Sequence, residues 1–189
     1  PKQNRLVLIA GMDIPGADVA SQNACGQSTG VALEFLQWWA SEDAAPARAL
    51  WQVAILPAAY PVGRRIDLPA FPPMKGYFND MADPEARYLW RWSAMNAPDL
   101  VVDLRISERA VRVANAPAKV LFTDAADTIP GEFIAALGTG SPSGLSPVAA
   151  LRLEDTPGGL LKILRDLVSN PLPHSELRAA LEKRAERDP

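Results

Sequence analysis

Residues 83–105 read DPEARYLWRWSAMNAPDLVVDLR, and this stretch decides the fold. Its first half carries the signals of a helix start: Asp83 is a good N-cap, Pro84 suits the first turn, and Glu85 favours the positive end of the helix dipole. Pro98 cannot continue a helix, so we expect the helix to end before it. The first half of the stretch is therefore predicted to be a short, well-delimited helix.

The second half of the stretch predicts a buried strand that ends in charged residues. Residues 100–102 form an apolar, β-branched run without alternation, which is typical of a strand covered on both faces. Asp103 and Arg105 follow at the carboxyl end of that strand. Ligands of open α/β sheets bind beyond the carboxyl ends of the strands, so these two residues are candidates for a functional site.

The rest of the chain repeats this alternation of strands and helices. The strand-like runs are residues 5–10, 50–56, 99–104, 119–122 and 149–153, and the helical patterns are residues 30–41, 84–96, 131–137, 157–169 and 175–187. Such alternation predicts an α/β fold, with a mostly parallel, mixed central sheet and helices on both faces. We expect one domain over residues 1–170, with residues 171–189 adding a C-terminal helix to it.

Composition excludes several classes of function. The chain has 189 residues, a net charge of -3 and a single cysteine, Cys25, so internal disulfides are impossible. Interspersed charges argue against nucleic-acid binding, and no apolar run is long enough for a transmembrane segment. No targeting segment is visible and the compartment stays unknown. The chain reaches a core strand at Leu6, so a larger parent protein and a removed leader both stay open.

The order of elements resembles the zinc carboxypeptidase family, with the related aspartoacylase and succinylglutamate desuccinylase group. In that family a first strand ends in Gly-x-His-Gly-x-Glu, which supplies two zinc ligands. Here the strand at residues 6–10 is followed by Gly11-Met12-Asp13-Ile14-Pro15-Gly16. Asp13 stands in the place of the histidine, and Gly16 in the place of the glutamate.

Further motifs extend the resemblance to the middle of the chain. The family's Pro-x-x-Asn-Pro-Asp-Gly and Asp-Leu-Asn-Arg-Asn-Phe-Pro are similar to residues 57–63 and to a shortened segment at residues 67–72, which lacks the substrate-holding arginine. The family's Pro-Asp-Leu-Val-x-Asp-Leu-His resembles residues 98–105, where Arg105 replaces the last zinc ligand. Glu154, which closes a later strand, is the counterpart of the family's catalytic glutamate.

The resemblance implies a carboxypeptidase-like fold with a degenerate zinc site and no resident cofactor. A catalytic zinc takes about three protein ligands, whereas only Asp13 could donate here and Arg105 is a permanent cation. We therefore expect a non-catalytic binding or interaction module. Its partner is either a small anionic or peptide-like ligand, with Arg105 as the fork for a carboxylate, or the rest of a larger parent protein.

Three other residues complete the predicted binding site. Asp13 and Asp103 are expected beside Arg105, and Tyr60 belongs to a long aromatic loop of the kind that is usually functional. Asp13, Arg105 and Glu154 should converge in one pocket, since each closes a strand. A simpler explanation stays open, in which Arg105 only neutralises neighbouring carboxylates, because buried charges need partners whatever their use.

Two catalytic alternatives also stay open. One is an active metallo-hydrolase, a carboxypeptidase or amide deacylase, with zinc and with Glu154 as general base. The other is a serine hydrolase, because Gly26-Gln27-Ser28-Thr29-Gly30 fits Gly-x-Ser-x-Gly. No strand precedes Ser28, which is better explained as a helix N-cap, and the single histidine, His174, lies in a proline-flanked linker.

Overall fold

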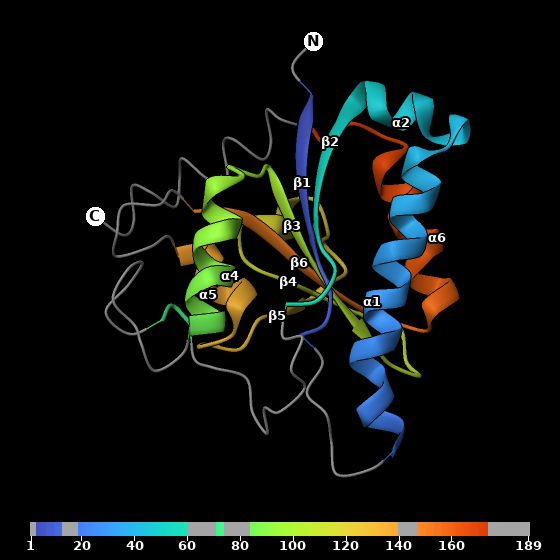
Figure 1. The fold of residues 1–189 in the computed structure, drawn as a ribbon. Coiled ribbons are helices and arrows are strands. Elements are labelled where there is room, and N and C mark those ends of the chain that lie inside the picture. Colours follow the sequence, from blue (N-terminus) through green and yellow to red (C-terminus); the bar gives the residue numbers. More distant parts are fainter. Residues whose placement is uncertain (1–2, 13–18, 60–70, 74–83, 140–146, 174–189) are drawn as a thin grey trace.

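The computed structural model shows a six-stranded sheet with helices packed on both faces (Figure 1). It describes residues 3–12, 19–59, 71–73, 84–139 and 147–173. The strands are β1 (Asn4–Ile9), β2 (Trp51–Leu56), β3 (Leu100–Ile106), β4 (Val111–Ala114), β5 (Ala126–Asp127) and β6 (Ala149–Asp155). The helices are α1 (Val19–Ala40), α2 (Ala45–Leu50), α4 (Pro84–Met95), α5 (Phe133–Thr139) and α6 (Pro157–Val168), with short 3-10 turns η1 (Glu42–Ala44) and η2 (Ala118–Val120).

The sheet has the order β2-β1-β3-β6-β4-β5 and is mixed. Strands β2, β1, β3 and β6 run parallel, whereas β4 pairs with β6 in the antiparallel direction and β5 follows β4. Helices α1 and α6 cover one face, and α4 and α5 cover the other (Figure 1). The predicted α/β class with a mostly parallel, mixed sheet is thus confirmed.

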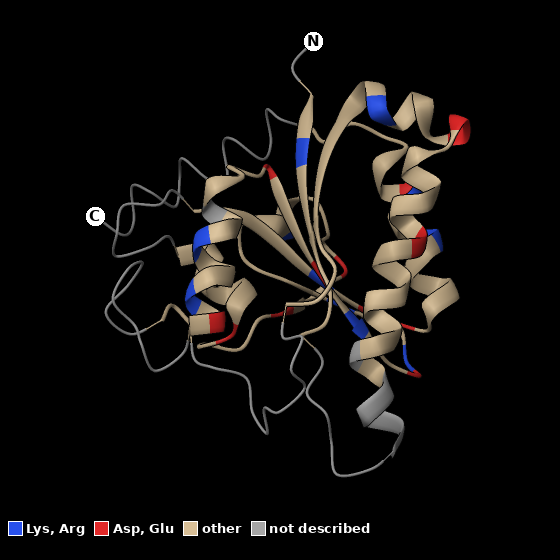
Figure 2. Cartoon of the chain, viewed as in Figure 1, with Lys and Arg blue, Asp and Glu red and all other residues tan. Residues whose placement is uncertain are grey.

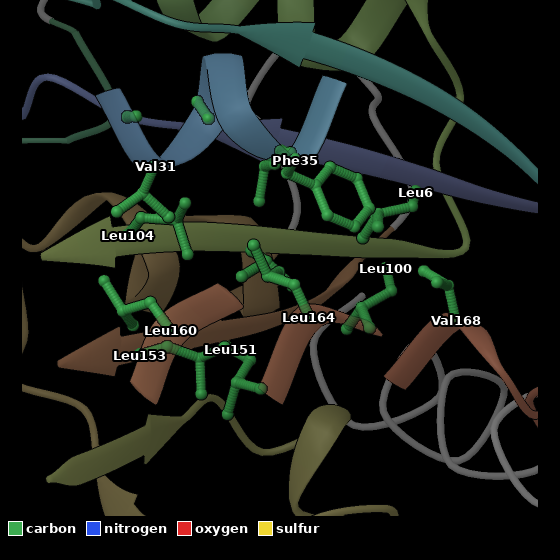
Figure 3. Close-up of a cluster of buried hydrophobic side chains, with 14 of the residues drawn as sticks. Leu6, Val31, Phe35, Leu100, Leu104, Leu151, Leu153, Leu160, Leu164 and Val168 are labelled. Carbon is green, nitrogen blue, oxygen red and sulfur yellow. The ribbon is translucent and has the colours of Figure 1, made fainter. Parts of the chain in front are cut away.

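The face under α1 and α6 holds the larger apolar cluster. Alternate residues of β3, namely Leu100, Val102 and Leu104, belong to this cluster. Figure 3 shows Leu100 and Leu104 on the same side as Phe35 of α1 and Leu164 of α6. The intervening Val101 points to the other face. Both faces of β3 are therefore buried, which explains why its sequence shows an apolar run instead of an alternation of apolar and polar residues.

The face under α4 and α5 is packed around three aromatic rings. The ring of Phe71 lies 5.1 Å from that of Phe133 and 6.1 Å from that of Trp90, centroid to centroid. Trp90 is buried on α4, and Phe133 is buried at the start of α5. The helix predicted from residues 84–96 therefore forms, and it covers this face of the sheet.

Two local predictions were wrong. Residues 119–122 do not form a strand, because the side-chain oxygen of Asn115 accepts a hydrogen bond from the Ala118 amide and turns the chain into η2; β4 and β5 flank this turn. The first helix begins at Val19 instead of Gly30, since the polar run before Ser28 continues the helix. The helix predicted over residues 175–187 lies outside the described residues.

Within the described part of the chain, no helix is both long enough and apolar enough to cross a bilayer.

Candidate functional site

A buried ion pair lies at the carboxyl end of β3. Nη2 of Arg105 lies 2.9 Å from Oδ2 of Asp103, and its Nε donates to both carboxylate oxygens at 3.0 Å. The side chain of Asp103 is 2% exposed and that of Arg105 is 13% exposed. Nη1 of Arg105 also donates to the carbonyl of Met12, which ties β3 to the segment that follows β1.

The neighbouring strand β6 presents charges at the same level. Asp103 is the register partner of Arg152, and Arg105 is the register partner of Glu154. Register partners in a parallel pair project to the same face, and residues two apart share that face, so all four side chains lie on the α4 and α5 side. Each cation therefore stands across from a carboxylate, an arrangement that stabilises neighbouring strands. Figure 2 shows acidic and basic residues close together where β3 and β6 end.

Arg152 joins this group to the turn before α5. Its Nη1 donates to Oε1 of Glu132 at 2.8 Å. Its Nε lies 2.8 Å from Oε1 of Glu154, but the N–H does not point at that oxygen, so this contact is an ion pair without a hydrogen bond. Oε2 of Glu132 also accepts from the Ile129 amide. We call these five residues the charged cluster: Asp103, Arg105, Glu132, Arg152 and Glu154.

The structure brings together part of the predicted site. Arg105, Asp103 and Glu154 lie at the carboxyl edge, as their positions at strand ends require. Asp13 and Tyr60 lie outside the described residues, so their predicted contacts stay predictions. Sequence reasoning did not find the Glu132–Arg152 pair. Its signal was the cationic Arg152 inside an otherwise apolar strand, since a charge there needs a partner.

The donors of this edge do not fit a catalytic zinc within the described residues. No group of three or more His, Cys, Asp or Glu side chains there could hold a metal ion. Both oxygens of Asp103 already accept from a guanidinium, which is a cation that does not lose its proton. A ligand set for zinc would have to come mainly from residues such as Asp13, outside the described part.

Ser28 is placed where a nucleophile could not act. It lies inside α1 and is fully buried, and its Oγ accepts a hydrogen bond from the Gly11 amide at 3.1 Å. The prediction that Ser28 caps a helix is wrong, because the helix starts nine residues earlier, at Val19. His174 lies outside the described residues. The serine in Gly-x-Ser-x-Gly is thus a buried contact between α1 and the end of β1.

Comparisons with known proteins show a similar fold and little sequence similarity. No family model matches the chain, and no curated protein matches it. A solved structure of a "putative metallopeptidase" from Shewanella amazonensis SB2B is similar with a TM-score of 0.51 at 12% identity, covering 100% of this chain and 79% of that one. At that identity the similarity concerns the α/β fold alone.

A second solved structure is more distant. The CwlD amidase from Clostridioides difficile, solved in complex with the GerS lipoprotein, has a TM-score of 0.43 at 7% identity and covers 98% of this chain and 100% of its own.

Proposed function

We propose that this protein is a carboxypeptidase-like binding module that recognises a small peptide-like ligand without a metal. The observation that carries the proposal is the register pairing of Arg105 with Glu154 at the carboxyl ends of two parallel strands. This edge is where open α/β sheets bind ligands. Asp103 and the Met12 carbonyl hold this guanidinium in one orientation, and a guanidinium held in that way suits recognition of a carboxylate.

The mixture of charges favours a zwitterion over a simple anion. The charged cluster contains two guanidinium groups and three carboxylates, so a purely anionic ligand would meet net negative charge. A peptide-like molecule can place its carboxylate at Arg105 and its amine at Glu154. In this proposal Asp103 orients Arg105, and Asp13 and Tyr60 are further contacts to the ligand.

An active metallo-hydrolase is the second candidate. Its support is the fold similarity to the Shewanella protein together with the position of Glu154 at the end of β6, where a general base could face substrate. Such an enzyme, a carboxypeptidase or deacylase, would need zinc held by Asp13 and by ligands elsewhere in the chain.

Metal analysis separates the two candidates. Protein purified without chelator should contain no stoichiometric zinc under the binding proposal, and about one equivalent would support the hydrolase instead. Calorimetry with the dipeptide Gly-Gly, its amide and its N-acetyl derivative then tests the ligand class. We expect Gly-Gly to bind, and either blocking group to weaken binding by roughly ten-fold, since hydrogen bonds to charged groups contribute about 1.5–3 kcal/mol.

A conservative substitution tests the role of Arg105. Arg105→Lys keeps the charge but loses the planar fork, so the preference for free Gly-Gly over its amide should shrink. Arg112→Lys, on the exposed ion pair of β4, is the matched control and should bind as the wild type does. Equal binding of Gly-Gly and its amide by the wild type would refute carboxylate recognition.

A further inference from the structure

A cleft of about 290 Å³ lies on the α4 and α5 side of the sheet, the side that also carries the charged cluster. Its walls come from the turn after β4, from α5 and from Phe71 and Pro72. Asn115 lines this cleft, and its backbone N–H donates to the carbonyl of Ala150, near the start of β6. Glu154 lies near the end of the same strand. Four strand residues correspond to about 13 Å along β6. The cleft and the charged cluster come nearest in sequence at Gly131, which lines the cleft, and Glu132, which belongs to the cluster.

The described lining of the cleft suits an uncharged ligand. Among the described residues that line it, none is an acid, a base or a histidine, and most of the wall is apolar. The side-chain amide of Asn115 makes four hydrogen bonds to the backbone. Its oxygen accepts from the N–H groups of Ala118 and Ala150, and its nitrogen donates to the carbonyls of Ile134 and Val148. Asn115 therefore forms the floor of the cleft in one fixed orientation, and its side-chain amide is engaged by the backbone instead of by a ligand.

Two hydroxyl groups line the wall, those of Thr128 and Thr139, and the one on Thr139 can accept a hydrogen bond from a ligand. The hydroxyl of Thr139 donates to the Ala136 carbonyl at 2.9 Å, which leaves its oxygen lone pairs as acceptors. An N–H or O–H on an otherwise apolar molecule would complement such an acceptor. A site of this kind, mainly apolar with one or two placed polar groups, is typical of small-molecule sites.

The walls of the cleft are held in place without a ligand. A Cβ on Gly138 would lie 2.9 Å from Nδ2 of Asn115, so α5 sits directly against the floor. The Phe71 amide donates to the Gly131 carbonyl at 2.9 Å, and the Phe71 ring packs on Phe133. A preformed cleft costs little ordering on binding, which favours occupancy by a small rigid molecule.

We propose that this cleft is a second binding site, for a small uncharged aromatic molecule that carries one hydrogen-bond donor. A cavity of about 150 Å³ suffices for a benzene-sized molecule. The larger volume here matches a two-ring molecule of the size of indole. The site is independent of the peptide-like ligand proposed for the charged cluster, so either proposal can fail alone.

Titration of the full chain with 5-fluoroindole, followed by fluorine NMR, tests the site. We expect saturable binding with a dissociation constant on the order of 0.1–1 mM, as suits a ligand of this size. Indole-3-carboxylate should compete at least about ten-fold more weakly than indole, because its charge would be desolvated. Absence of saturable binding up to several millimolar would overturn the proposal.

Substitutions locate the binding. Ala135→Phe fills the cleft from α5 and should weaken 5-fluoroindole binding at least ten-fold, whereas Ala135→Ser leaves the volume open and should bind as the wild type does. Ala116→Phe fills the cleft from the exposed turn after β4 and repeats the test if the α5 variant does not fold. Arg105→Lys should leave the affinity unchanged. Binding that persists in both filled variants would place the molecule elsewhere and refute the proposal.

Discussion

Arg105 lies directly across from Glu154, at the carboxyl ends of the adjacent parallel strands β3 and β6. Two residues earlier, Asp103 and Arg152 repeat the pairing with the charges exchanged. Opposite charges thus face each other at both levels, and the two arginines are further held by Asp103 and by Glu132. The edge of the sheet where ligands are expected is therefore charged, and its positive and negative side chains pair with one another.

The first prediction concerns the stability that Arg105 provides. Arg105→Ala would leave the carboxylate of Asp103, which is almost completely buried, without its main partner. Breaking such a pair from one side typically costs about 3–5 kcal/mol, so the midpoint of denaturant unfolding should fall markedly. Chemical denaturation followed by circular dichroism measures the change in the free energy of unfolding.

An exposed ion pair supplies the control. Arg112 contacts Asp124 at 3.3 Å, with side chains 44% and 69% exposed, so Arg112→Ala should cost no more than about 1 kcal/mol. Equal losses in the two variants would show that Arg105 is solvated and that the pair with Asp103 is unimportant. Stability alone does not separate ligand binding from simple neutralisation; the peptide titrations do that.

The second prediction concerns Asn115, which joins four segments through its side chain. Three of its four bonds are buried and the one to Val148 is partly buried, so Asn115→Ala would remove the partner of the Ala118 and Ala150 amides and one bond from each of two carbonyls. Each unsatisfied buried group costs about 1–3 kcal/mol, so we expect a loss of at least about 3 kcal/mol. Asn96→Ala, which removes one bond to the Trp92 carbonyl, should cost about 1 kcal/mol under the same denaturation assay. A similar loss in both variants would contradict this account of Asn115.

Local signals in the sequence predicted much of the fold. The helix that starts at Pro84 and the strand at residues 100–106 follow from a capping residue, a proline and an apolar β-branched run, all of which act within a few residues. The η2 turn was mispredicted because it depends on a side-chain bond from Asn115 that overrides the apolar pattern of residues 119–122.

The site was harder to predict than the fold. Strand ends could be located from the sequence, so Asp103, Arg105 and Glu154 could be assigned to one edge. The pairing of Arg152 with Glu132 could not, because it joins residues twenty positions apart through the packing of α5 on the sheet. The pairing of carboxylates with arginines depends on distances in the folded protein, which the sequence pattern does not indicate.

The third prediction concerns Gly11, which follows β1 with a φ of +72°. A Cβ at this position would lie 2.9 Å from the Cα of Ala58, and backbone cannot yield as a flexible side chain can. Gly11→Ala should therefore cost about 2–4 kcal/mol, from the left-handed backbone and the overpacking together. Thermal unfolding should show the loss as a lowered Tm.

A second glycine is the matched control for Gly11. Gly26 is exposed on α1, and a Cβ there would meet nothing within 4 Å. Gly26→Ala should raise the stability by up to about 1 kcal/mol, because alanine favours a helix interior. A Gly11→Ala protein as stable as the wild type would mean that the close approach of residues 11 and 58 is not required.

The last prediction concerns Ala97, which follows α4 with a φ of +41°, in the left-handed region that an L side chain seldom adopts. The helix must turn there because Pro98 comes next and the chain enters β3 at Leu100. Glycine relieves the left-handed penalty of about 1–2 kcal/mol but loses about 0.5–1 kcal/mol through its freer unfolded chain. Ala97→Gly should therefore stabilise the protein by about 0.5–1 kcal/mol, whereas Ala97→Val, branched at Cβ, should destabilise it. Opposite shifts of Tm in the two variants are the expected result, and shifts of the same sign would show that backbone strain at Ala97 does not limit stability.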